Sequence, residues 1–433
     1  MKFNTALIRS LCRDLITYDL VQGNVDYEWI DIVGIPPRPE ISKKVRLYFA
    51  SYSMPDGWTA QFDRRPQAVE IARQQGWHII SDEKPSLVSV PVIYVVSLPL
   101  VARRLYDYAR LLYFPLIIGV TGSVGKTSIV SFIETLLMNN NCNVLRFYSK
   151  RLTPMSVMCH FINRVDATTE VIAIEYSAYR MNHIATLAEL LPPSIAFITN
   201  IYNTHISVDL FPDQTSILQS KLMIRTNQTR CSFINNDIIR LGLIKPSDVS
   251  DWKIFNTQEP PCEYRNMPPT KRTSELYTVG VLVADQLGFP MHIVAESLRD
   301  FVPSEQRILP IKIAGKRIFF HGETSGGSRL WSWFETNDKS VPFLFVEEID
   351  FGDEDSLGFK SLLENIFSKQ TTLVYDTPVN RSRLVVPAQF VSWDDFTSKL
   401  RHATGYIVYH KALATRRKDF VPTAYIWQIL KTD

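Results

Sequence analysis

The residues best suited to chemistry lie in a glycine-punctuated stretch at 121–128, which reads T-G-S-V-G-K-T-S. An apolar run precedes it at 115–120, and apolar residues recur after it with the spacing of one helix face. A strand, a glycine turn and a helix N-terminus bind phosphate, because backbone N–H groups and the helix dipole favour negative charge there. Lys126 would reach the β- and γ-phosphates of a nucleotide, and the Thr127 hydroxyl would bind Mg²⁺. The sequence thus predicts a nucleoside-triphosphate site formed by Thr121, Gly122, Ser123, Val124, Gly125, Lys126, Thr127 and Ser128.

This loop departs from the general phosphate-loop pattern G-x-x-x-x-G-K-[ST] at one position. The pattern needs glycine at position 120, where this chain has Val120. A glycine turn that happens to precede Lys-Thr would explain the residues without any ligand. The strand and the helix expected on either side of the turn favour the phosphate-binding interpretation.

Length and composition bound the class of protein. A chain of 433 residues is too long for one compact core, and apolar and charged fractions of 45% and 21% are typical of soluble globular proteins. A net charge of +3 is too small to indicate a nucleic-acid or membrane partner. The five cysteines are scattered without a C-x-x-C pair, which predicts reduced thiols in a cytoplasmic protein. The longest apolar stretch, 88–101, is shorter than the roughly 20 residues of a spanning helix, so no membrane segment is expected.

The order of expected elements predicts an α/β protein of three domains. Residues 1–113 would form a small α/β domain, 114–303 a mostly parallel sheet covered by helices, and 304–433 a third, Rossmann-like α/β unit. The expected strands are 45–50, 77–81, 90–96, 144–148, 171–175, 195–200, 318–320, 341–346 and 406–409. The expected helices are 66–75, 98–112, 213–225 and 357–369, with turns at 56–57 and 315–317. The order of the short pieces within 373–391 stays open.

Polar residues end two of the central strands. Glu175 closes the strand 171–175, and Asn200 closes the strand 195–200. Ligands of parallel sheets bind at the carboxyl ends of the strands, so these two residues are candidates for the nucleotide and its metal. His205 follows, and Lys221 lies on the helix expected after Asp213. The alternatives without a function are a solvated strand end for Glu175, a surface or capping role for His205, and an ordinary helix position for Lys221.

Taken together, these residues resemble the Mur ligase family of ATP-dependent ligases, which join an amino acid or peptide to a carboxylate. The stretch 119–128 is similar to the family's phosphate loop, and I-E-Y-S-A at 174–178 resembles its acidic strand end. T-N-I at 199–201 with His205 and Lys221 resembles its T-N-I-x-x-x-H block and helix lysine. The N-terminal region is most similar to the MurE and MurF branches.

The resemblance implies a mechanism and a role for each residue. A substrate carboxylate would attack the γ-phosphate of ATP, and an amine would then displace phosphate from the acyl phosphate. Lys126 would hold the phosphates, Thr127 and Glu175 a first Mg²⁺, and His205 a second. Lys221 would be carbamylated and catalytic, and Arg307 would match the family's linker arginine. Asn200 would help to bind ATP, and the partners would be a small-molecule carboxylate and an amine.

Three family motifs are missing. The Asp-Ser-Arg that helps hold a uridine nucleotide in MurE and MurF is not recognisable at 35–40. The adenine-binding motif G-x-H-N-x-x-N is replaced by K-R-T-S-E-L at 271–276, and the C-terminal D-D-x-Y-N-A-N-P by H-G-E-T-S-G-G-S at 321–328. In the latter, Glu323 is a candidate for an acidic role. The phosphate and metal machinery is thus expected to be retained while substrate recognition has changed.

Three functions are compatible with these residues. The leading hypothesis is a Mur-type ligase that acts on a non-standard substrate in a specialised pathway. A divergent MurF-like ligase for cell-wall precursors is the nearest alternative. The third is a nucleotide-binding, Mur-like protein without ligase activity, against which the retained set of Lys126, Thr127, Glu175 and His205 argues.

Overall fold

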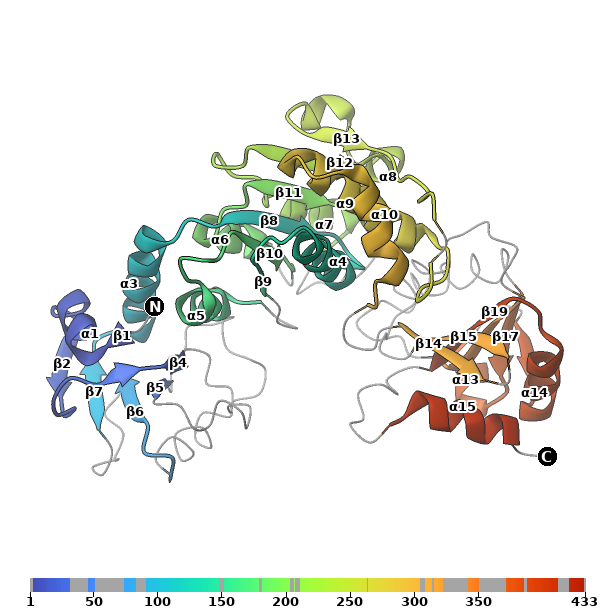
Figure 1. The fold of residues 1–433 in the computed structure, drawn as a ribbon, viewed down its shortest axis with the longest axis horizontal. Coiled ribbons are helices and arrows are strands. Elements are labelled where there is room, and N and C mark those ends of the chain that lie inside the picture. The colour runs from blue at the N-terminus through green and yellow to red at the C-terminus, as the bar shows by residue number, and fades with distance from the viewer. Residues whose placement is uncertain are drawn as a thin grey trace. The chain divides into compact units, whose positions relative to one another are not determined.

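The computed structural model describes residues 3–31, 46–50, 74–82, 91–147, 152–178, 181–202, 206, 211–262, 264–303, 308–313, 315–321, 342–349, 371–384, 388–411 and 420–431. The chain has two compact units. One comprises Met1–Ile117, Asn143–Ile172 and Thr186–Pro192, and the other comprises Ile118–Cys142, Ala173–Ala185 and Pro193–Asp433. Helices and strands alternate along the chain, so the predicted α/β class is confirmed (Figure 1). The domain limits expected at 113/114 and 303/304 remain predictions.

The N-terminal part forms a five-stranded sheet in the order β2-β7-β6-β5-β4. Its strands are β2 Ile16–Asp19, β4 Trp29–Asp31, β5 Arg46–Ala50, β6 His78–Ser81 and β7 Val92–Val95, with β1 Phe3–Asn4, β3 Asp26–Tyr27 and α1 Thr5–Leu11 beside them in the sequence. Neighbours from β4 to β7 are parallel, and β2 is antiparallel to β7. The strands expected at 45–50, 77–81 and 90–96 are confirmed. The helix expected at 66–75 (apart from residues 74 and 75) and the turn expected at 56–57 lie outside the described residues.

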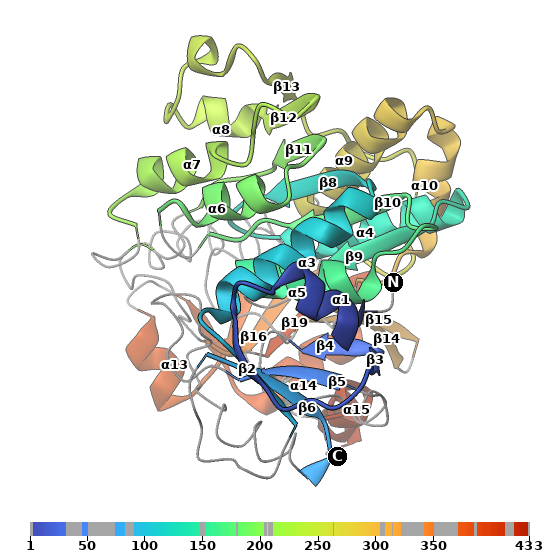
Figure 2. The same cartoon turned by 90° about the vertical axis from the view of Figure 1, so that its left-hand side faces the viewer.

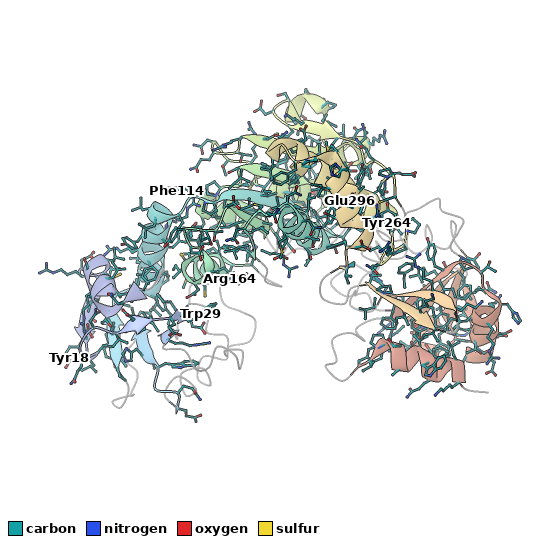
Figure 3. The ribbon with its side chains drawn as sticks, in the orientation of Figure 1. Tyr18, Trp29, Phe114, Arg164, Tyr264 and Glu296 are labelled. Atoms are coloured by element: carbon teal, nitrogen blue, oxygen red, sulfur yellow. The ribbon has the colours of Figure 1, made fainter. Side chains whose placement is uncertain are left out.

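Helix α3, Leu98–Leu112, has the bounds that its sequence predicts. The Ser97 side chain accepts a hydrogen bond from the Leu100 N–H and so caps the helix N-terminus. Its buried face repeats every three or four residues, as an amphipathic helix requires: Leu98, Val101, Ala102, Leu105, Tyr106 and Ala109. Phe114, two residues beyond the helix, is 78% exposed and is labelled in Figure 3.

The central sheet has six strands in the order β13-β12-β11-β8-β10-β9. They are β8 Leu116–Thr121, β9 Val144–Phe147, β10 Val171–Glu175, β11 Ile195–Ile198, β12 Cys231–Asn235 and β13 Lys253–Phe255. The pairs β8–β11, β11–β12 and β12–β13 are parallel. Ile198 pairs with Thr121 at the carboxyl ends of β11 and β8, so the phosphate loop and the segment after β11 start from the same edge.

The helices between and after these strands are α4 Lys126–Asn139, α5 Pro154–Arg164, α6 His183–Leu190, α7 Gln214–Leu222, α8 Asn236–Arg240, α9 Lys271–Leu287 and α10 Met291–Asp300, with a 3₁₀ turn at Pro246–Val249. Helix α4 packs against α9 and α10, as the two views of the ribbon show (Figures 1 and 2). Phe132 of α4 meets Phe301 edge to face, 5.3 Å between ring centroids. At the start of α9, Arg272 lies beside Gly125, the residue that directly precedes α4.

The C-terminal part forms a third sheet in the order β14-β15-β19-β16-β17-β18. Its elements are β14 Ile308–Ile313, β15 Lys316–His321, β16 Leu344–Glu348, β17 Thr372–Tyr375, α13 Pro378–Arg383, β18 Gln389–Val391, α14 Trp393–His402, β19 Tyr406–Lys411 and α15 Pro422–Lys431. All neighbouring pairs are parallel except the β14–β15 hairpin. The predicted turn at 315–317 is confirmed as a hairpin, although Lys316 and Arg317 already belong to β15. The helix expected at 357–369 lies outside the described residues.

None of the helices in the described ranges is both long and apolar enough to cross a membrane. All five cysteines lie in the described ranges, and none of them forms a disulfide there.

Candidate nucleotide-binding site

The loop between β8 and α4 has the backbone of an anion-binding turn. Gly125 precedes the helix with φ of +79°, a left-handed conformation that glycine adopts without strain. No side chain caps α4, and no acidic residue lies in its first turn. The first N–H groups of a helix have no partner within the helix, so the start of α4 presents donors and the positive end of its dipole. The loop can therefore receive phosphate oxygens.

Lys126 lies folded over this loop. Its Nζ atom donates hydrogen bonds to the carbonyl oxygens of Gly122 and Ser123, at 2.9 and 3.1 Å. The same atom is 3.9 Å from Glu175 Oε1. The ammonium group is thus held at the mouth of the loop, where it can transfer its hydrogen bonds to a phosphate.

Thr127 and Glu175, the pair that the resemblance assigns to a first Mg²⁺, are joined by a hydrogen bond. The Thr127 hydroxyl donates to Glu175 Oε2 at 2.7 Å, and the Ser177 hydroxyl donates to Glu175 Oε1 at 2.7 Å. A hydroxyl and a carboxylate are oxygen ligands of the kind that Mg²⁺ takes together with substrate phosphates and waters. No cluster of three or more His, Cys, Asp or Glu side chains suited to a metal occurs within the described ranges. The residues present fit a metal that is completed by the nucleotide.

Asn200 and Thr121 support the loop from beneath. Asn200 Oδ1 accepts from the Val124 N–H and its Nδ2 donates to the Val124 carbonyl, both at 3.0 Å. The Thr121 hydroxyl is fully buried and donates to the carbonyl of Tyr176 at 2.7 Å. Ser123 is bound through its N–H to the Asn200 carbonyl, at 3.0 Å. These side chains fix the shape of the loop, a role that the sequence did not distinguish from direct contact with the nucleotide.

Lys221 reaches the loop from α7. Asp213 caps that helix as expected, accepting from the Ser216 N–H at 2.7 Å. The Lys221 side chain is buried and its Nζ donates to the Gly122 carbonyl at 3.0 Å. Burial, and then the neighbouring Lys126, hold the pKa of Lys221 well below its usual value, with Glu175 acting in the opposite sense. A lowered pKa favours the uncharged amine, which is the form that reacts with carbon dioxide.

Two predicted residues, His205 and Arg307, lie outside the described part of the chain, as does Glu323. Their roles remain predictions. Among described residues, the sequence interpretation missed the contributions of Ser177, Arg272 and Glu275. Ser177 stands two positions after the strand-ending Glu175, a spacing that returns its side chain to the same face.

Arg272 and Glu275 lie in the stretch 271–276, which replaces the adenine-binding motif expected from the resemblance. Both are about 1% exposed on α9, and Arg272 Nη1 donates to Glu275 Oε2. Lys271 instead pairs with Asp237 of α8 at 2.9 Å. The charged side chains at these positions are thus bound to each other or to α8.

Comparison with known proteins agrees with this geometry. Residues 120–249 match the model of the Mur ligase middle domain. The UDP-N-acetylmuramoylalanine–D-glutamate ligase of Thermosipho africanus is 26% identical over 252 residues, which cover 56% of this chain and 55% of that protein. The corresponding ligase of Lactiplantibacillus plantarum is 30% identical over 142 residues, which cover 33% of this chain and 27% of that protein. The chain therefore spans about half the length of the first of these relatives and about a quarter of the second.

Solved structures match over nearly the whole chain. MurF from Acinetobacter baumannii has a TM-score of 0.73 and 13% identity, with 99% of both chains covered. MurF from Thermotoga maritima in complex with ADP has a TM-score of 0.66 and 16% identity, with 90% of this chain and 95% of that chain covered. The fold of the chain is that of the three-domain Mur ligases. Residues 120–249 are thus similar in sequence to the middle domain of Mur ligases, and the chain as a whole shares the fold of MurF.

Proposed function

We propose that this protein is an ATP-dependent ligase that joins a carboxylate to an amine through an acyl phosphate and releases ADP and phosphate. The observation that carries the proposal is the convergence of Lys126, Thr127 and Glu175 at the start of α4, joined by the 2.7 Å hydrogen bond between Thr127 and Glu175. A purely structural descendant of a ligase has no need for a cation, a hydroxyl and a carboxylate aimed at one phosphate loop. The matches to Mur ligases agree with this chemistry.

The chain's own residues supply positioning and charge. The N–H groups at the start of α4 receive the nucleotide phosphates, and Lys126 turns its ammonium from the loop carbonyls to phosphate oxygens as charge develops on them. The substrate carboxylate then attacks the γ-phosphorus, and ADP leaves. The amine attacks the acyl carbon, loses a proton, and inorganic phosphate leaves. We place no side chain in the role of base for that proton.

A divalent cation, Mg²⁺ by preference, would be held by the Thr127 hydroxyl and by Glu175. When bound, it would neutralise charge on the β- and γ-phosphates. We also assign a metal-binding role to His205, and a carbamylated Lys221 would add an anionic oxygen near the same loop. The lowered pKa of Lys221 and its burial beside the loop support that modification.

For the substrate, we propose a small-molecule acid and a small-molecule amine outside the ordinary cell-wall precursor route. The relatives are named for UDP-N-acetylmuramoylalanine and D-glutamate, or as MurF. The support for a different substrate is the sequence of this chain, in which the uridine and C-terminal motifs are replaced. A divergent MurF-like ligase is the alternative. The scattered cysteines, which form no disulfide in the described ranges, support a cytoplasmic location. We also propose three domains, at 1–113, 114–303 and 304–433.

The test is phosphate release by the purified protein with ATP and Mg²⁺, over a matrix of acids and amines. Release that requires both an acid and an amine, with a stoichiometric amide product, is the expected result. The panel includes UDP-N-acetylmuramoyl peptides, so that turnover on these alone would favour the MurF-like alternative. ATP binding without turnover on any pair, and with binding lost in Lys126→Ala, would overturn the ligase in favour of a non-catalytic nucleotide-binding protein.

A further inference from the structure

The first turn of α9 carries a buried ion pair that the ligase chemistry does not use. Arg272 and Glu275 are three residues apart, and each side chain is about 1% exposed. Arg272 Nη1 donates to Glu275 Oε2, while Arg272 Nε has no hydrogen-bond partner in the described part of the chain. Removing two charged groups from water is unfavourable, and a well-packed apolar pair of the same size would often be as stable. Stability alone therefore does not explain this ion pair.

One end of this pair lies against the phosphate loop. A Cβ atom added to Gly125 would come within 2.6 Å of Arg272 Nη1 and 2.7 Å of its Cζ. The guanidinium group thus occupies the space beside the glycine that directly precedes Lys126. Gly125 also needs its left-handed backbone, with φ of +79°, to start α4. Arg272 closes off this side of the loop and limits where Gly125 can move.

The other end of the pair reaches the loop through Asn200. Glu275 Oε2 accepts a hydrogen bond from Asn200 Nδ2 at 3.2 Å. The same amide group binds both the N–H and the carbonyl of Val124 at 3.0 Å. The orientation of the Asn200 amide is fixed because its Nδ2 must face the carboxylate, and this in turn aims its Oδ1 at the Val124 N–H. Side chains of α9 thus constrain two consecutive loop residues, Gly125 directly and Val124 through Asn200.

We propose that Arg272 and Glu275 are positioning residues that hold the phosphate loop in its nucleotide-binding shape before the nucleotide arrives. Both act on the loop from the side of α9, through Gly125 and Asn200. Their effect is to reduce the ordering that binding would otherwise require, which raises affinity without a new contact. The inference rests on the nucleotide site proposed above, and it assigns a function to a stretch in which the family's adenine motif is missing.

The decisive variant removes both charges together, Arg272→Met with Glu275→Leu. A single substitution would leave one buried charge unpaired and could unfold the protein, whereas the paired apolar replacement preserves volume. The matched control is Arg265→Gln with Asp300→Asn, which removes an exposed ion pair of 2.8 Å in the same compact unit. Unfolding midpoints within a few degrees of wild type are expected for both double variants.

The first readout is hydrogen exchange of the ligand-free proteins, which does not depend on any activity. The Val124 amide should exchange at least about 10-fold faster in the Arg272/Glu275 variant, because the Asn200 amide is no longer oriented. Exchange in β8 and in the control variant should match wild type. Equal protection of Val124 in all three proteins would overturn the proposal.

The second readout is nucleotide affinity, measured by calorimetry with ADP and with the non-hydrolysable analogue AMPPNP. We expect affinity to fall about 10- to 100-fold in the Arg272/Glu275 variant, with the KM for ATP rising and kcat at saturating ATP changing less than about 3-fold. Wild-type affinity in this variant would also overturn the proposal. If the wild-type protein itself binds neither nucleotide, the proposed function fails, and the exchange result still decides whether the pair holds the loop.

Discussion

Lys126 and Lys221 donate hydrogen bonds to the same acceptor, the backbone carbonyl oxygen of Gly122, at 2.9 and 3.0 Å. Two ammonium groups on one carbonyl repel each other, and the one that is more deeply buried loses its proton more easily. Lys221 is the more buried of the two. Burial lowers its pKa, and the nearby charge of Lys126 lowers it further. The phosphate loop thus has two lysines on one carbonyl, and the pKa of the more buried one, Lys221, is held below its ordinary value.

This relationship predicts that Lys221 forms a carbamate. An uncharged amine attacks carbon dioxide and releases a proton, and the product replaces repulsion from Lys126 with attraction. With ¹³C-bicarbonate, wild-type protein should show a carbamate carbon signal that is absent in Lys221→Met and retained in Lys126→Met. Rate should fall by at least about 100-fold in Lys221→Met, as when a charge stabiliser is lost. Full activity in carbon-dioxide-free buffer, or a plain ammonium at Lys221 in a structure of the active protein, would contradict the prediction.

The pH dependence of this lysine has a definite sign. The folded-state pKa lies below the ordinary value of 10.5, so the unfolded chain binds the proton more readily. The contribution of Lys221 to stability is therefore most favourable above pH 10.5 and is lost as pH falls toward its folded-state pKa. Lys221→Met should be more stable than wild type at neutral pH in the absence of bicarbonate, as measured by urea unfolding. Between pH 10 and pH 7 the wild type should also lose more stability than Lys221→Met; an equal loss in both proteins would contradict a lowered pKa for Lys221.

Glu175 should be needed for the metal rather than for the fold. Glu175→Gln keeps the size of the side chain but removes its charge, so activity should fall by about 100-fold or more. A titration of Mg²⁺ against rate should give a weaker metal affinity. Ser177→Ala is the matched control because it removes only the hydrogen bond to Glu175 Oε1, and a loss of about 10-fold or less is expected. Unchanged metal dependence in Glu175→Gln would remove Glu175 from the site.

Local signals in the sequence predicted the elements that build the site. Ser97 and Asp213 cap the helices expected after them, and the strand ending at Glu175 has the predicted bounds. Propensity and capping act over a few residues, so one sequence is enough to show them. In the same way, the strand, the glycine turn and the helix around Lys126 were predicted from local signals, while the roles of Lys126 and Thr127 stay predictions.

Interactions over long sequence separations were not predictable. Glu275 and Asn200 are 75 residues apart, and the sequence showed the stretch that holds Arg272 and Glu275 only as a replaced motif. Their burial depends on contacts with Asn200 and Gly125, which are distant in the sequence. In the segment 373–391, β17, α13 and β18 are each six residues or fewer, too short for periodicity to order them.

Gly125→Ala should weaken nucleotide binding for two separate reasons. Alanine at a φ of +79° is strained by roughly 1–2 kcal/mol, and its Cβ would collide with the Arg272 guanidinium. The affinity for ADP, measured by calorimetry, should fall by at least about 10-fold. Gly288→Ala is the matched control, since Gly288 has a φ of +72° and open space around its Cα. The control should lose about 1 kcal/mol of stability but keep its affinity for ADP; equal affinities for all three proteins would exclude a constraint by Arg272.

The C-terminal sheet should lose stability in acid through His410. His410 Nδ1 lies 3.1 Å from His321 Nδ1 between the paired strands β15 and β19, with both rings buried. Burial lowers the pKa of His410 from 6.5 to about 4, opposed in part by a hydrogen bond with the His321 backbone. Its contribution to stability is fully present above pH 6.5 and is lost as pH falls from 6.5 to about 4, below which both states are protonated. At pH 5 the loss should be ~2 kcal/mol, from the difference between these two pKa values.

Urea unfolding of wild type and of His410→Asn, at pH 7 and pH 5, measures this loss. The variant keeps an amide in place of Nδ1 and should lose less stability in acid. An equal loss in both proteins would assign the acid sensitivity to other groups.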